Sequence, residues 1–269
     1  MLFRSIKNRV EVLITTMHCK DYIELLNRMN IQGSSRIGNQ SDKNEITEFE
    51  YNNAIHTAYQ FREKGVGLNR NNLLMRTNSE FCLFGDDDIV YVNNYESIVL
   101  QCFQKYKNAD VLIFNLDEKY SKRYKIKEDH RVNFFNFMRY GTARVAIRTK
   151  SIHMHGILFN TCFGGGTLHS NGEDTLFLNA CLKAGLHVYA VAQTIGTLTD
   201  DRQSSWFHGY NDKYFVDKGM LYYLINRRYY WVLIFQDAAR HRKMYNKKFS
   251  YLMKIMNRGA LDAKNRTYK

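Results

Sequence analysis

Three consecutive carboxylates, Asp86, Asp87 and Asp88, follow an apolar segment at residues 81–84 and a single glycine. A short apolar run of this kind predicts a buried strand. Carboxylates side by side repel one another unless water or a cation screens them. An open α/β sheet binds ligands beyond the carboxyl ends of its strands, and carboxylate oxygens suit Mg²⁺ or Mn²⁺. The segment therefore predicts a site for a divalent cation with a bound phosphate. The alternative is a solvated acidic turn.

A second pair of carboxylates, Glu173 and Asp174, stands at the start of a segment with helical spacing. Apolar residues recur one helical turn apart through residue 184, and Gly185 predicts the end of the helix. Acidic side chains in a first turn complement the helix dipole, which gives the pair a purely structural explanation. From these residues alone, that explanation and a functional site both remain open.

Two glycine-rich stretches lie between these acidic segments and before them. Gly65 and Gly67 would let the backbone turn sharply or approach a ligand closely, and Arg70 between them and Asn72 could pair with a phosphate. We expect residues 65–72 to form a loop and residues 73–77 to continue into a helix. The run of three glycines at 164–166 would likewise make room for a substrate.

The composition describes a globular protein with a large core. Of 269 residues, 45% are hydrophobic and 14% aromatic, which excludes general disorder. No apolar run approaches the roughly 20 residues of a membrane span, and the first residues lack the pattern of a secretory signal. Five cysteines without a CxxC pair predict reduced thiols in a cytosolic protein, rather than a disulfide framework or zinc site.

The net charge of +13 is concentrated near the C-terminus. Residues 220–269 carry 12 Lys or Arg and 2 Asp, a balance of +10, whereas residues 1–219 carry 27 basic and 24 acidic side chains, a balance of +3. A nucleic-acid-binding domain spreads its basic residues over the fold, so this distribution disfavours that function despite a pI near 9.4. A local basic segment instead predicts an interaction tail.

The hydrophobic pattern predicts alternating strands and helices. Strands are expected at 10–16, 34–41, 45–51, 81–84, 111–116 and 187–191, and helices at 21–29, with Asp21 as N-cap, and at 92–106. This order favours a doubly wound parallel sheet.

Several of these segments together resemble the family 2 glycosyltransferases of the GT-A fold. The likeness rests on the strand at 10–16, the stretch 65–72, the aspartate triplet, and residues 164–177 followed by 204–210, and it covers about residues 10 to 220. It is strongest to bacterial enzymes that extend capsule, exopolysaccharide or O-antigen. It implies an α/β domain at 1–219, with a Rossmann-like, mostly parallel sheet flanked by helices, and a helical extension at 220–269.

The resemblance also implies roles for the matching residues. Asp86 and Asp88 would hold Mn²⁺ or Mg²⁺ and the nucleotide-sugar donor, with Asp87 between them, and His208 would add a later metal ligand. Asp174 would be the general base that deprotonates the acceptor hydroxyl, beside Glu173. The remaining matches would surround the two substrates: Arg70 near the diphosphate, Thr15 and Thr16 against the nucleoside, and Trp206 on the acceptor side.

The chain departs from the family pattern at two places that concern the nucleotide. Thr15 stands where the family often has proline, and Asn39 and Gln40 stand where it often has an aspartate that reads the base. An amide pair can still hydrogen-bond the edge of a uracil. The sequence therefore favours a UDP-sugar while leaving the base open.

The function implied is inverting, metal-dependent transfer of a sugar from a nucleotide diphosphate to a hydroxyl of a glycan or lipid-linked oligosaccharide, in surface polysaccharide synthesis. A basic, aromatic tail predicts peripheral association with the anionic inner face of the bacterial plasma membrane; packing of its aromatic residues on the catalytic domain is the alternative. Two other classes were weighed. A GT-A homologue that binds nucleotide sugar without turnover stays open, and phosphoryl transfer is disfavoured because the chain has no GxxxxGK[ST] loop.

Overall fold

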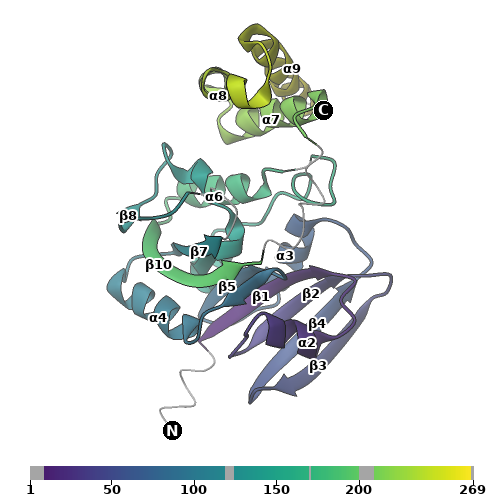
Figure 1. The fold of residues 1–269 in the computed structure, drawn as a ribbon, viewed down its shortest axis with the longest axis vertical. Helices are drawn as coiled ribbons and strands as arrows, with labels where there is room; N and C mark the ends of the chain where they lie inside the picture. Colours follow the sequence, from purple (N-terminus) through teal and green to yellow (C-terminus); the bar gives the residue numbers. More distant parts are fainter. Residues whose placement is uncertain (1–8, 119–123, 170, 200–208, 268–269) are drawn as a thin grey trace.

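The computed structural model describes residues 9–118, 124–169, 171–199 and 209–267. Its centre is a sheet with the strand order β3-β4-β2-β1-β5-β9-β7-β10-β6, and the short β8 pairs with β10 (Figure 1). Four neighbouring strands run parallel: β4 (Ala54–Phe61), β2 (Ser35–Gln40), β1 (Val10–Met17) and β5 (Phe81–Asp86). This stretch carries the strand ends at which a ligand site was predicted.

The rest of the sheet is mixed. The strand β9 (Val145–Arg148) lies antiparallel between β5 and β7 (Val111–Glu118), and β10 (Val188–Leu198) returns parallel to β7. Three antiparallel strands complete it: β3 (Glu45–Tyr51), β6 (Ile89–Tyr91) and β8 (His130–Arg131). The predicted α/β fold with helices on the sheet is confirmed.

Helices cover both faces of the sheet because β1 and β5 are apolar on both sides. Val12 and Ile14 of β1 belong to a buried cluster with α2 (Tyr22–Arg28) and α4 (Tyr95–Lys105). Leu13, between them, belongs to a second cluster with α3 (Val66–Leu74), α5 (Thr149–Met154) and α6 (Glu173–Lys183). Successive side chains of a strand point to opposite faces, so a continuous apolar run must be covered twice.

Two local predictions concern the ends of helices. The Asp21 side chain accepts a hydrogen bond from the Glu24 amide and caps α2, as expected. The stretch 65–72 is not a loop: α3 begins directly after Gly65, whose φ of 126° is open to glycine, and it runs through Arg70 to Leu74. The prediction was wrong because the glycines were taken to break a helix that neighbouring segments stabilise; the Val66 amide, for example, donates to the Gly165 carbonyl oxygen.

The C-terminal region forms three helices, α7 (Asp212–Ile225), α8 (Tyr230–Tyr245) and α9 (Phe249–Thr267), called here the helical unit. The helices α7 and α9 cross at two glycines. A Cβ atom on Gly219 would lie 1.9 Å from the carbonyl oxygen of Met256, and one on Gly259 would lie 2.0 Å from that of Val216. Only glycine at both positions allows this close approach of the two backbones. The boundary expected after residue 219 lies inside α7.

The helical unit packs against the sheet domain beyond α6 (Figure 1). Phe215 and Leu221 of α7 belong to the same buried cluster as Phe177 of α6. Tyr222 and Tyr223, aromatic residues of the tail, belong to this cluster too, which fits the predicted packing of the tail on the domain. Association of the tail with a membrane stays a prediction. Within the described ranges, no helix has both the length and the apolar character that crossing a membrane would require.

Candidate active site

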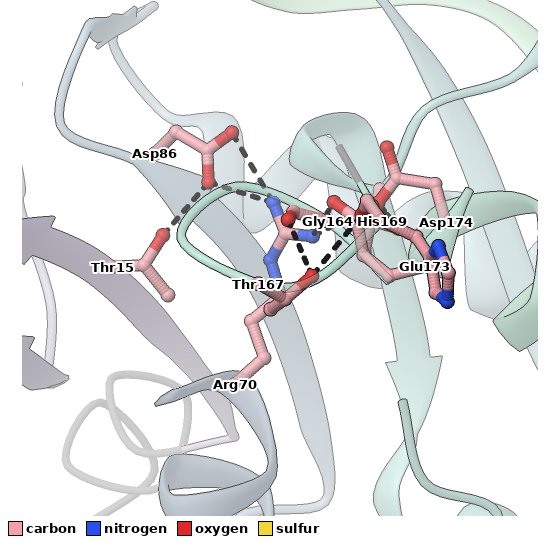
Figure 2. Close-up of polar contacts among 9 residues, drawn as sticks. Thr15, Arg70, Asp86, Gly164, Thr167, His169, Glu173 and Asp174 are labelled. Atoms are coloured by element: carbon pink, nitrogen blue, oxygen red, sulfur yellow. Dashed lines mark hydrogen bonds and ion pairs between the residues drawn. The ribbon is translucent and has the colours of Figure 1, made fainter. Parts of the chain in front are cut away.

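Three of the predicted carboxylates converge on the guanidinium of Arg70, which is 3% exposed (Figure 2). Its Nη2 atom donates to Asp86 Oδ1 at 2.9 Å, and its Nη1 atom lies 2.9 Å from Asp174 Oδ1 and 3.4 Å from Glu173 Oε1. The end of β5, the middle of α3 and the start of α6 therefore meet at one point. One buried cation there faces three carboxylates.

Phe159 holds Arg70 and its neighbour in place, in addition to the ion pairs of Arg70. The guanidinium lies over the ring of Phe159, with 5.4 Å from Cζ to the ring centroid, an attractive placement for a cation. The next residue, Asn71, donates to and accepts from the backbone of Phe159. Burial alone would lower the pKa of Arg70, but the charges of Asp86, Asp174 and Glu173 raise it above its usual value. The arginine is thus a fixed positive charge.

Glu173 is the most deeply buried of the three carboxylates. Its carboxyl group lies against Gly164, where an added Cβ would come within 2.7 Å of Glu173 Cδ, and φ is +105°. Burial and the neighbouring charge of Asp174 raise the pKa of Glu173 to about 7, against the opposing effect of Arg70. Near neutral pH the Glu173 carboxyl group is therefore only partly ionised.

Asp174 is the more accessible member of the pair, with a side chain 30% exposed. Besides Arg70, Thr142 binds it: the Thr142 hydroxyl donates to Asp174 Oδ1. Thr142 begins the 3-10 turn η2 (Thr142–Arg144) and was not among the predicted site residues. Its segment shows no charge or glycine pattern that would have singled it out.

Thr15 and Thr16 orient the aspartates at the end of β5. The strands β1 and β5 pair in parallel with Thr15 opposite Asp86. The Thr15 hydroxyl donates to Asp86 Oδ1 at 2.8 Å, and the Thr16 hydroxyl donates to Asp87 Oδ2 at 2.7 Å. The structure thus brings Thr15 into the cluster as a partner of Asp86; contact of the two threonines with a nucleoside stays a prediction.

Asn39 and Gln40, predicted to lie near the base, support the surrounding backbone. The Asn39 amide donates to the Cys19 carbonyl oxygen at 2.8 Å and accepts from the Cys19 amide at 3.1 Å. Gln40 Oε1 accepts from the Gly65 amide, at the start of α3, at 2.8 Å. Both side chains hold the segments that frame the end of β1, and a role in reading the base remains a prediction.

The oxygen ligands that Mg²⁺ or Mn²⁺ prefers are present at the end of β5, in Asp86 and Asp88. Asp86 is already shared by Arg70 and Thr15. Among the residues that the structure describes, no three His, Cys, Asp or Glu side chains are grouped as a metal site. His208 and Trp206, predicted as a metal ligand and an acceptor contact, lie outside the described residues. The carboxylate oxygens have the chemistry that such a cation requires, but a bound metal stays a prediction, and its remaining ligands would come from the diphosphate.

The glycine-rich segment at 162–169 links this site to the helical unit. Gly164 contacts Glu173 at one end, and at the other end His169 Nδ1 lies 2.8 Å from Asp217 Oδ1 in α7. Asp217 also binds Lys213 Nζ at 2.6 Å. Burial by itself would raise the pKa of Asp217, but the hydrogen bonds from His169 and Lys213 lower it overall. The pair His169–Asp217 was not predicted, since its members are 48 residues apart.

No protein-family model and no curated protein matches this chain. Solved structures do. Residues 1–349 of TarS from S. aureus in complex with UDP-GlcNAc match with a TM-score of 0.64 and 16% identity, over 87% of this chain and 73% of that one. The same part of TarS with UDP gives 0.60 and 16%, over 87% and 72%. A further structure of S. aureus TarS matches with a TM-score of 0.61 and 14% identity, over 87% of this chain and 43% of that one. Likeness at this level shows the fold, so the chain has the GT-A glycosyltransferase fold.

Proposed function

We propose that the protein is a glycosyltransferase that moves a sugar from a UDP-sugar to a hydroxyl group. The observation that carries this proposal is the meeting of Asp86, Arg70 and Asp174 at the carboxyl ends of β1 and β5, in a fold whose solved neighbours were crystallised with UDP and UDP-GlcNAc. Three features of this cluster fit sugar transfer: the fixed positive charge of Arg70, the carboxylate of Asp86 at a strand end, and the accessible carboxylate of Asp174.

In the proposed reaction the acceptor oxygen attacks the anomeric carbon while the bond from that carbon to the diphosphate oxygen breaks. UDP leaves with the electron pair, and the acceptor proton passes to Asp174, the general base. Attack on the face opposite to the leaving group inverts the anomeric centre. Arg70 supplies fixed positive charge for the diphosphate. A bound Mn²⁺ or Mg²⁺, held by Asp86 and Asp88, would add positive charge at the same group.

The proposed acceptor is a glycan or a lipid-linked oligosaccharide, in surface polysaccharide synthesis at the inner face of the bacterial plasma membrane. Support comes from the surface of the helical unit. Trp231 and Phe235, one helical turn apart on α8, are 56% and 54% exposed, and Arg227 and Arg228 precede them on the surface. Aromatic side chains beside basic ones suit the interface of an anionic bilayer.

Thermal stabilisation by nucleotides tests the donor site. We would measure Tm with UDP, UDP-GlcNAc, GDP and CDP, each with and without Mn²⁺. A ligand at 100 times its Kd stabilises the native state by about 2.7 kcal/mol, which raises Tm by several degrees in a protein of this size. We expect stabilisation by UDP that Mn²⁺ strengthens, and that Asp88→Ala weakens.

The control is Asp42→Ala, which removes an exposed aspartate between β2 and β3 and should leave the UDP effect intact. Stabilisation by UDP without release of UDP from UDP-GlcNAc would favour the non-catalytic homologue. The absence of any nucleotide effect in the wild type would refute the donor site itself.

A further inference from the structure

Thr142 is a core residue whose hydroxyl contacts the proposed general base, Asp174. The residue is fully buried, at the start of η2 and directly before β9, the strand enclosed between β5 and β7. From there its hydroxyl donates to Asp174 Oδ1. Threonine is branched at Cβ and restricted in χ1, so a buried threonine presents its hydroxyl in a fixed direction.

The two oxygens of Asp174 are in different surroundings. Oδ1 receives two hydrogen bonds, one from Thr142 and one from Arg70 Nη1 at 2.9 Å. Oδ2 receives none from the residues that the structure describes. It lies beside Gly141, where an added Cβ would be 3.3 Å away, so the glycine leaves space next to this oxygen. A carboxylate held by one oxygen and open at the other presents a single defined basic atom.

Arg70 alone would not define that geometry. Its guanidinium is shared among Asp86, Glu173 and Asp174, and in the proposed reaction it also faces the diphosphate, whose charge changes during turnover. Thr142 is neutral and touches neither Asp86 nor Glu173 by any hydrogen bond of the described residues. The position of the Thr142 hydroxyl therefore does not depend on the bound nucleotide sugar.

We propose that Thr142 is a positioning residue that fixes Asp174 through Oδ1, so that Oδ2 faces the acceptor. This inference rests on the proposed function. When the acceptor oxygen bonds to the anomeric carbon and UDP departs, the acceptor proton is transferred to Oδ2. The hydrogen bond to Oδ1 thus fixes the direction in which Oδ2 points while the proton is transferred.

The test compares two changes at Thr142 with a matched one elsewhere. Thr142→Val removes the hydroxyl and keeps the shape, whereas Thr142→Ser keeps the hydroxyl. Thr149→Val is the control, because Thr149 is also a buried threonine, at the opposite end of β9, and its hydroxyl contacts Cys82. The readouts are kcat and KM for release of UDP from UDP-GlcNAc with water as acceptor, and stabilisation by UDP.

We expect Thr142→Val to lower kcat roughly 10- to 100-fold with KM for UDP-GlcNAc unchanged, because donor binding does not involve the base. Thr142→Ser should restore most of kcat, and Thr149→Val should leave kcat unchanged.

A second measurement does not depend on turnover. The urea midpoints of Thr142→Val, Asp174→Asn and the double variant form a double-mutant cycle, in which residues in contact are non-additive. Additive midpoints would show that the contact is absent and would overturn the inference.

The outcomes separate the inference from the function on which it rests. A wild type that releases UDP, with a Thr142→Val variant of unchanged kcat, would overturn the role of Thr142 alone. A Thr142→Val variant that loses stabilisation by UDP along with kcat would show a structural role in the donor site, again against positioning of the base. A wild type that binds UDP but releases none would remove the base and, with it, this inference.

Discussion

Two clusters of buried charge among the described residues are built in opposite ways. In the sheet domain one cation, Arg70, faces the carboxylates of Asp86, Glu173 and Asp174. In the helical unit one carboxylate, Asp237, is surrounded by donors: Lys218 Nζ and His241 Nδ1 each lie 2.8 Å from its Oδ1, and the Tyr245 hydroxyl lies at 3.2 Å.

The difference lies in the balance of charge. Asp237 has a cation and further donors for its single charge, so the cluster needs nothing else and joins α7 to α8. The cluster at Arg70 has more negative than positive groups, and the pKa of Glu173 is raised because of burial and the neighbouring carboxylate. An excess of one charge in a buried site is costly unless a ligand offsets it. This contrast predicts that one cluster serves binding and chemistry and the other serves stability.

The sharpest test of that contrast is to neutralise one carboxylate in each cluster. Asp174→Asn removes the proposed base, and we expect the rate of UDP release to fall roughly 10²- to 10⁴-fold with stabilisation by UDP retained. Asp237→Asn should lower Tm but leave the rate per folded molecule unchanged. Both are measured by nucleotide release and thermal unfolding. Equal effects of the two changes on turnover would remove the distinction.

The cations of the two clusters give the next largest effect. Arg70→Met and Lys218→Met each leave buried carboxylates without their cation, which costs roughly 3–5 kcal/mol for a buried pair. We expect the larger loss in Arg70→Met, since three carboxylates remain there, and the smaller in Lys218→Met, since His241 and Tyr245 remain with Asp237. Urea unfolding measures both losses. Stabilisation by UDP should disappear only in Arg70→Met, and its loss in Lys218→Met as well would contradict a purely structural cluster.

A third comparison is between the exposed aromatic residues of the helical unit and an exposed apolar residue of the sheet domain. We expect a combined Trp231→Ala and Phe235→Ala change to weaken binding to phosphatidylglycerol vesicles by roughly tenfold or more. Tm should fall only slightly, since both side chains are more than half exposed and Phe235 contacts the ring of Phe249. Flotation with vesicles measures the binding, and vesicles of phosphatidylcholine alone report the dependence on charge. Ile46→Ala, at an exposed apolar residue of the edge strand β3, is the matched control. Unchanged flotation of the double variant would count against the membrane surface.

The raised pKa of Glu173 predicts how the stability of the protein depends on pH. The folded-state pKa of about 7 lies above the usual value of 4.5 for a glutamate, so the folded protein binds more protons between these values than the unfolded chain. Stability therefore falls as pH rises through this window, by up to about 1.4 kcal/mol per pH unit. Glu173→Gln should remove this contribution, so that the variant gains on the wild type from pH 5 to pH 7 in urea unfolding. A constant difference between the two proteins would show that Glu173 is not the titrating group.

Local patterns in the chain predicted much of this architecture. The apolar runs of β1 and β5, the Asp21 cap and the start of α6 at Glu173 depend on neighbours within a few residues, and all were found in the structure. The carboxylates at the end of a strand also indicated where the candidate site lies, because carboxylates contribute nothing to the apolar packing of a buried strand. The same reasoning failed for α3, whose glycines and arginine fit a loop until Gly165 and Phe159 are placed beside them.

The sequence by itself thus determined the fold class, the acidic strand end and the basic tail, since each follows from composition or from periodicity over a few residues. Only the tertiary structure decided which groups meet. Arg70 and Asp174 are 104 residues apart and Thr142 and Asp174 are 32 apart, and Asn39, predicted beside the base, binds Cys19. The physical reason is that a hydrogen bond or ion pair acts over a few ångströms, and the distance between remote residues is set by how strands and helices pack.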